Sequence, residues 1–186
     1  MSIDLNNPEF VAPFSPAAAW KRALIVHLGG FFNLRTLVET GTCWGDTVGE
    51  VRHAFTDVWS IELSPTFYNH AKNRFADDPH VHLIFGSSGE MLSSIIEQTT
   101  SPLLFWLDAH PTGGPSADNG DQAPLELDII ARMRPDSLVL IDDVRPEGNG
   151  YASPGSHVIV PDGWQTRFLS GVLALHAGGY AIPEKF

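Results

Sequence analysis

One turn of the sequence carries most of the information on its architecture: Val38-Glu39-Thr40-Gly41-Thr42-Cys43-Trp44-Gly45-Asp46-Thr47. An acid, Glu39, lies near the end of a short apolar run, and two glycines four residues apart, Gly41 and Gly45, then open a helix-like stretch. Gly41 permits a tight turn with close backbone approach, and Gly45 allows the start of a helix to lie near a ligand. This pattern is typical of a nucleotide-binding turn, although strand-to-helix turns also contain glycine for steric reasons alone. The nicotinamide fingerprint G-x-G-x-x-G is absent, which counts against a dehydrogenase.

Apolar runs and helix-like stretches alternate on both sides of this turn. A first helix is predicted over 15–30, where Ser15 is a candidate N-cap and Pro16 the first helical residue. Strands are then predicted at 36–40, 57–62, 81–85, 102–108 and 137–142, and helices at about 46–55, 65–76, 88–98 and 124–133. The alternation predicts an α/β fold, which is a Rossmann-like, doubly wound, mostly parallel sheet with helices on both faces in a single domain.

Two segments interrupt the alternation. Residues 109–123 and 143–157 are rich in Gly, Pro, Asn, Asp and Ser, and both are predicted to be loops. Each follows the carboxyl end of a predicted central strand, where ligands bind in open α/β sheets. For the C-terminal part we expect a helix near 163–176, which would contain His176, and a final strand near 179–183.

The chain divides into an N-terminal arm with its helix, residues 1–30, and the α/β domain itself, residues 31–186. Of its 186 residues, 43% are hydrophobic and 18% charged, so the chain can bury a sizeable core. The formal net charge of -11 counts against nucleic acid and anionic membranes as partners. A single cysteine, Cys43, excludes an intrachain disulfide, and the first ten residues lack the features of a secretory signal. We therefore expect a cytoplasmic protein.

A second acid follows at the end of the next predicted strand. Glu62 lies seventeen residues after Gly45, close to where an acid would bind ribose hydroxyls in a nucleotide site. A helix-capping carboxylate explains Glu62 equally well when it is taken alone. Together with the Gly41 turn, the ribose interpretation is favoured.

These residues resemble the motifs of the class I S-adenosylmethionine (SAM)-dependent methyltransferases. The pattern E-x-G-x-x-x-G-x-T from Glu39 to Thr47 resembles their motif I, and Ile61-Glu62 resembles their ribose-binding motif. Gly86-Ser87-Ser88 is similar to the Gly-Ala-Ser of catechol-type enzymes, in which the serine lies by the adenine. The resemblance implies SAM as cofactor, bound by Glu39, Gly41, Thr42, Gly45, Thr47, Glu62, Ser87 and Ser88.

Three further acids follow the fourth and fifth predicted strands: Asp108, Asp142 and Asp143. If these strands are neighbours, the three carboxylates converge at one edge of the sheet and need a compensating cation. Their oxygens suit Mg²⁺ or another hard divalent ion. Each acid taken alone could instead be a helix or loop cap, or a solvated residue at a strand end. The catechol-type and macrocin-type O-methyltransferases hold their metal in this pattern, so the resemblance implies a metal site at these three residues.

His110 is a candidate general base, or a fourth metal ligand, two residues after Asp108. The catechol-type enzymes place a lysine base three residues after the first metal-binding Asp, where this chain has Pro111, so that base is not carried over. We predict His110 and Asp108 as the catalytic residues.

The expected function is divalent-metal-dependent O-methylation of a hydroxyl group on a small molecule, with residues 109–123 closing over the substrate. Two alternatives stay open, namely a cofactor-binding protein of the same fold without turnover and an α/β oxidoreductase on another nucleotide. The C-terminal hairpin that usually completes the methyltransferase sheet is not recognised after residue 157. A reduced substrate wall, or one supplied by a second subunit of a homodimer, would follow.

Overall fold

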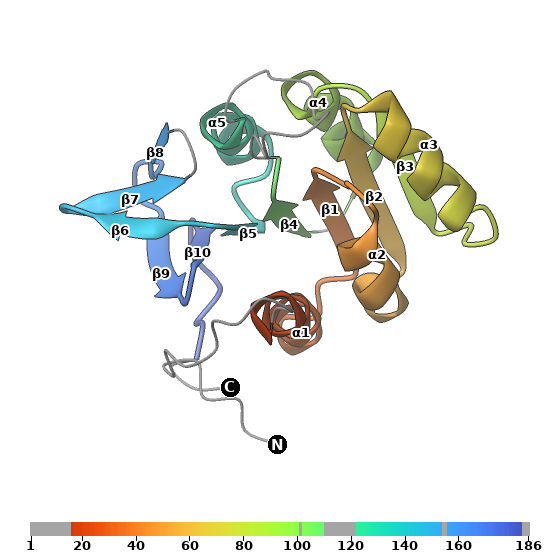
Figure 1. Ribbon diagram of the computed structural model, residues 1–186. Coiled ribbons are helices and arrows are strands. Elements are labelled where there is room, and N and C mark those ends of the chain that lie inside the picture. The colour runs from red at the N-terminus through yellow and green to blue at the C-terminus, as the bar shows by residue number, and fades with distance from the viewer. Residues whose placement is uncertain (1–15, 101, 110–121, 154–155, 184–186) are drawn as a thin grey trace.

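The computed structural model describes residues 16–100, 102–109, 122–153 and 156–183. Most of its strands form one seven-stranded sheet in the order β3-β2-β1-β4-β5-β10-β9 (Figure 1). These strands are β1 (Thr36–Thr40), β2 (Asp57–Glu62), β3 (Val81–Phe85), β4 (Leu103–Leu107), β5 (Leu138–Ile141), β9 (Gln165–Leu169) and β10 (Val172–His176). Strands β1 to β5 pair in parallel, while β10 is antiparallel to both β5 and β9.

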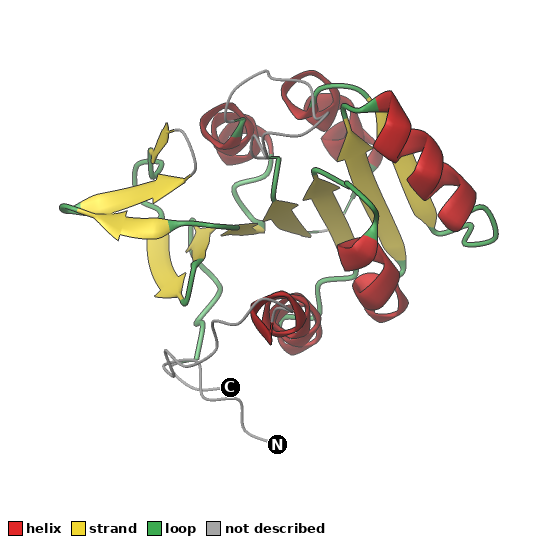
Figure 2. Ribbon diagram, viewed as in Figure 1, coloured by secondary structure: helices red, strands yellow, loops and turns green. Residues whose placement is uncertain are grey.

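Helices cover both faces of this sheet, as Figure 2 shows. They are α1 (Pro16–Phe31), α2 (Asp46–Val51) with the 3₁₀ turn η1 (Arg52–Ala54), α3 (Pro65–Arg74), α4 (Ser88–Gln98) and α5 (Ala123–Met133). Buried residues of α1, α2 and α3 share one hydrophobic cluster, and those of α4 and α5 share the other. The predicted doubly wound α/β fold, with its five parallel strands and the helices between them, is confirmed.

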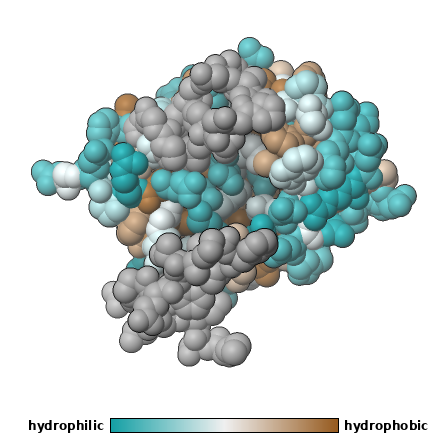
Figure 3. Space-filling view, viewed as in Figure 1, coloured by the Kyte–Doolittle hydropathy of each residue, from teal (hydrophilic) through white to brown (hydrophobic). Residues whose placement is uncertain are grey.

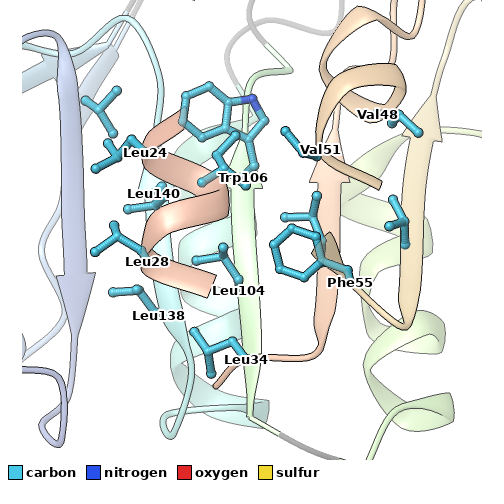
Figure 4. Packing of buried hydrophobic residues seen from close by; sticks show 14 of the residues in the cluster. Leu24, Leu28, Leu34, Val48, Val51, Phe55, Leu104, Trp106, Leu138 and Leu140 are labelled. Carbon is cyan, nitrogen blue, oxygen red and sulfur yellow. The ribbon is translucent and has the colours of Figure 1, made fainter. Parts of the chain in front are cut away.

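The central strands divide their side chains between the two clusters. Leu104 and Trp106 of β4 lie on the α1 face, whereas Phe105 and Leu107 lie on the face of α4 and α5. Helix α1 rests on the first of these faces through an apolar stripe spaced for one side of a helix, Leu24, Ile25 and Leu28. In Figure 4, Leu24 lies above Leu28 along α1, whereas Leu140 lies above Leu138 along β5, so α1 runs opposite to the strands. The start of α1 therefore lies toward the carboxyl edge of the sheet.

The expected helix at 163–176 and strand at 179–183 are wrong. Strands β9 and β10 form a hairpin there, and Ser170 and Gly171 make its turn with φ of 44° and 94°. Positive φ at both turn residues matches the twist of a two-residue hairpin, and this Ser-Gly signal was overlooked. All five residues of β10 are buried, so its sequence has an apolar run from Val172 to Leu175 and no alternation of polar and apolar residues. His176 is the last residue of this strand. The hairpin that was not recognised from the sequence is present and completes the sheet.

The predicted loop at 143–157 is also wrong in part. It contains β6 (Arg145–Glu147), β7 (Gly150–Ser153) and β8 (Ser156–Val158), which form a separate antiparallel sheet. These strands are three or four residues long, too short to show a periodic pattern in the sequence. In the other predicted loop, 109–123, helix α5 already begins at Ala123, while residues 110–121 lie outside the described part of the chain.

The coloured part of the surface in Figure 3 is mainly hydrophilic, and its apolar side chains are divided among small patches. None of the helices in the described ranges combines the length and apolar character needed to cross a bilayer.

Candidate functional site

The turn after β1 is shaped by contacts within the chain. Gly41 has φ of 86°, and a Cβ atom there would lie 2.5 Å from the carbonyl oxygen of Asp108. Gly45 has φ of 75°, and its Cβ would lie 2.8 Å from the Phe75 ring. Both positions therefore require glycine, because of the left-handed backbone and the close approach of other groups. The tight turn predicted at Gly41 is present, whereas a ligand near Gly45 stays a prediction. The group that approaches Gly41 is the backbone of Asp108, directly after β4.

Glu39 is buried in a hydroxyl network beneath this turn. Its carboxyl accepts a hydrogen bond from the Ser60 hydroxyl, which lies opposite on β2 and is 2.5 Å from the Thr42 hydroxyl. Burial raises the pKa of Glu39 to about 8; the Ser60 hydrogen bond acts against this shift, and the nearby carboxylates of Asp108 and Glu62 add to it. Glu39 is therefore largely protonated at neutral pH. Ser60 was missed because only the register of β1 on β2 brings it to Glu39.

Glu62 connects two segments through its carboxylate. One oxygen accepts the backbone N–H of Cys43 and the other that of Ser64, both at 2.7 Å. Ser64 is the residue that precedes α3, so Glu62 connects the start of this helix to the Gly41 turn. Each oxygen retains a second lone pair for a ligand hydroxyl, and the ribose role stays a prediction.

The remaining predicted cofactor residues lie at the starts of α2 and α4. Thr47 is partly exposed in the first turn of α2, and Ser87 is the partly buried residue that precedes α4. Ser88 is 5% exposed, and its hydroxyl makes no hydrogen bond within the described residues. A buried hydroxyl without a partner is costly, so Ser88 is a position that a polar ligand group would satisfy.

Asp108 and Asp142, two of the predicted metal ligands, follow neighbouring strands at the carboxyl edge of the sheet. The backbone N–H of Asp108 donates to Thr40 and that of Asp142 to Leu107, which extends the parallel pairing one residue beyond β4 and β5. The expected neighbourhood of these two strands is confirmed. The glycine turn and the aspartates meet where Gly41 approaches the backbone of Asp108.

Lys21, which the sequence motifs did not indicate, lies at these aspartates. Its ammonium is 2.6 Å from Asp142 Oδ1 and 2.8 Å from Asp143 Oδ1. Asp143 has φ of 51°, and its backbone N–H donates to Asp142 Oδ1 at 2.7 Å. Burial disfavours the charged form of Lys21, but the two carboxylates together outweigh it and raise the pKa of the ammonium. Burial also raises the pKa of Asp142, against the opposing effect of Lys21. The signal was available, since Lys21 precedes Leu24 and Ile25 by one turn on the buried side of α1.

These residues do not fit a divalent metal ion as they are arranged. No three His, Cys, Asp or Glu side chains in the described ranges come together as a metal site, and Asp142 and Asp143 already share a lysine ammonium. His110, the predicted base, lies outside the described residues.

Comparison with known proteins gives similarity in structure only. No protein-family model and no curated protein sequence matches the chain. Among solved structures, the O-methyltransferase TomG from Streptomyces achromogenes in complex with SAM has a TM-score of 0.55 at 19% identity, over 73% of this chain and 58% of TomG. The Bacillus cereus O-methyltransferase in complex with SAH (S-adenosylhomocysteine) gives 0.55 at 18%, over 74% and 60%. SAH-bound methyltransferase PaMTH1 from Podospora anserina gives 0.61 at 12%, over 95% and 89%.

The matched region thus spans less than two thirds of the TomG and Bacillus chains. In this fold the glycine turn follows β1, Glu62 is the last residue of β2, and an antiparallel hairpin ends the sheet. This chain has the fold of the class I SAM-dependent methyltransferases.

Proposed function

We propose that the chain is a SAM-dependent methyltransferase that methylates a hydroxyl group of a small molecule. The observation that carries the proposal is the contact between the two parts of the carboxyl edge. The turn at Gly41, which Glu62 holds, packs directly against the backbone of Asp108. A cofactor bound at the turn and an acceptor bound at Asp108 would therefore lie next to each other, which methyl transfer requires.

The glycine side would bind the cofactor, which supplies a methyl group on a positively charged sulfur. Glu62 is fixed by two backbone amides, so its remaining lone pairs are oriented toward ribose hydroxyls without loss of side-chain freedom on binding. The buried Ser88 hydroxyl gains the partner that it lacks within the described residues. Protonated Glu39, with Ser60 and Thr42, keeps the turn in place.

Asp108 would orient the acceptor. Its carboxylate can accept the hydrogen bond of the substrate hydroxyl and take the proton as the new bond forms. Bound SAM would supply the methyl carbon to which this oxygen bonds, and the electron pair of the carbon–sulfur bond would leave on sulfur as SAH. The main contributions of the protein are alignment and proton removal.

The first test is isothermal titration calorimetry with SAH on the wild type and on Glu62→Gln, with the exposed Glu97→Gln on α4 as control. We expect micromolar binding that Glu62→Gln weakens at least about tenfold, or about 1.4 kcal/mol. Isotope-labelled SAM with panels of phenols and sugar alcohols then tests transfer to oxygen. Absence of SAH binding would overturn the proposal, and binding without transfer to any acceptor would favour a cofactor-binding protein.

A further inference from the structure

We propose that the ammonium of Lys21, and not a divalent metal ion, is the resident cation of the acceptor side of this site. The inference rests on the proposed function for its catalytic meaning, while the ion pairs themselves are features of the chain. Lys21 lies 2.6 Å from Asp142 and 2.8 Å from Asp143, the two residues that the resemblance assigns to a metal.

The fold places Lys21 there through the packing of α1. Lys21 continues the apolar stripe of Leu24, Ile25 and Leu28 by one turn toward the N-terminus. Because α1 runs opposite to the strands, this turn lies at their carboxyl edge, where Asp142 follows β5 (Figure 4). The lysine stem is therefore directed by the hydrophobic core, and only 18% of its side chain is exposed.

The aspartates are arranged around the ammonium as a built site. Asp142 has only 7% of its side chain exposed. Its Oδ1 forms the ion pair with the Lys21 ammonium and accepts a hydrogen bond from the backbone N–H of Asp143. The left-handed φ of Asp143 interrupts the alternation of a strand, which allows consecutive carboxylates to reach one cation. Leaving a buried carboxylate without a cation is strongly destabilising, so Lys21 meets the need that a metal would otherwise meet.

Two consequences distinguish a lysine from a metal. A cation that belongs to the chain is not removed by chelators, so methyl transfer should be unchanged by EDTA. In addition, loss of the ammonium alone should leave two adjacent carboxylates whose oxygens suit a hard divalent ion. Lys21 is therefore a positioning residue, which holds the carboxylates of Asp142 and Asp143. Its replacement by an uncharged residue should create affinity for a divalent metal ion at these carboxylates.

The experiment is a calorimetric titration with Mn²⁺ of the wild type, Lys21→Met, and the double variant Lys21→Met/Asp142→Asn. Methionine keeps the apolar stem without the charge, and Lys72→Met on the exposed side of α3 is the matched control. We expect no saturable binding by the wild type or the control below about 1 mM. Lys21→Met should bind at least about tenfold more tightly, and the double variant should lose this gain.

Binding of Mn²⁺ by the wild type that Asp142→Asn abolishes, with no gain in Lys21→Met, would overturn the inference. If Lys21→Met does not fold, the wild type and Asp142→Asn decide: equally negligible binding supports Lys21, and binding by the wild type alone overturns it. SAH is titrated in parallel. Its failure to bind would refute the proposed function, while the Mn²⁺ result would still determine which cation resides at the aspartates.

Discussion

The carboxyl edge of the sheet has two parts that concentrate acids and stabilise them in different ways. The glycine half, at the ends of β1 and β2, contains Glu39 and Glu62, which are held by hydroxyls and backbone amides. The aspartate half, at the ends of β4 and β5, contains Asp142 and Asp143, which are held by the Lys21 ammonium. One half thus uses neutral donors and the other a cation from a helix more than a hundred residues away in the sequence.

The difference shows that a carboxylate at a strand end has no fixed role. In the glycine half, the donors belong to β2 and to the turns after β1 and β2, and none lies more than 21 residues from its acid in the sequence. In the aspartate half, the local sequence Asp142-Asp143 is compatible with a metal, and only the packing of α1 supplies a different cation. The following variants test this contrast.

The largest effect is expected at the junction of the halves. Gly41→Ala places a methyl group 2.5 Å from the Asp108 carbonyl and strains a φ of 86°, whereas Gly163→Ala meets only the strain, with φ of 79° and open space. We expect Gly41→Ala to lower the free energy of unfolding by about 3 kcal/mol or more, and Gly163→Ala by about 1 kcal/mol. Urea unfolding measures both. Equal losses would mean that the two halves are not in the close contact described above.

The next effect concerns the neutral donors of the glycine half. Glu62→Gln replaces one acceptor oxygen by an NH₂ group that must face a backbone N–H, at either Cys43 or Ser64. We expect a loss of about 2 to 3 kcal/mol in the free energy of unfolding. Exposed Glu97→Gln is the control and should be near neutral. A Glu62→Gln protein as stable as the control would show that these amides do not depend on the charge.

In the aspartate half, the two partners of Lys21 should differ. Asp142 has 7% of its side chain exposed and Asp143 has 58%, although both contact the same ammonium. We expect Asp142→Asn to lower the free energy of unfolding by about 2 kcal/mol, and Asp143→Asn by less than about 1 kcal/mol. Asparagine tolerates the left-handed φ at position 143, so that variant isolates the charge. Thermal unfolding of the two proteins side by side checks the order, and a reversed order would contradict it.

The same contrast explains what the sequence could predict. The five parallel strands, their helices and the Gly41 turn follow from local patterns, because glycine spacing and apolar runs are read along the chain. The β9–β10 hairpin was missed because β10 is buried on both faces and shows no alternation. Ser60 and Lys21 reach their acids only through strand register and helix packing, which involve distant residues. Local signals therefore predicted that these acids lie at the ends of the strands, but they did not predict which groups the acids contact.

A pH-dependent effect separates the buried acid of the glycine half from the charged ones. Glu39 has a pKa of about 8 in the fold and an ordinary value of 4.5, so the folded chain keeps a proton that the unfolded chain has lost between these values. The stability contributed by this proton is complete below pH 4.5 and is lost as the pH rises through about 8. Glu39→Gln cannot ionise and retains an oxygen for the Ser60 hydroxyl. We expect the variant to match the wild type near pH 5 and to become progressively more stable than the wild type as the pH rises toward 8.5. Urea unfolding of both proteins across this range measures the difference, with Glu97→Gln as the control that should follow the wild type at every pH. A difference between Glu39→Gln and the wild type that stays constant with pH would mean that folding does not raise the pKa of Glu39.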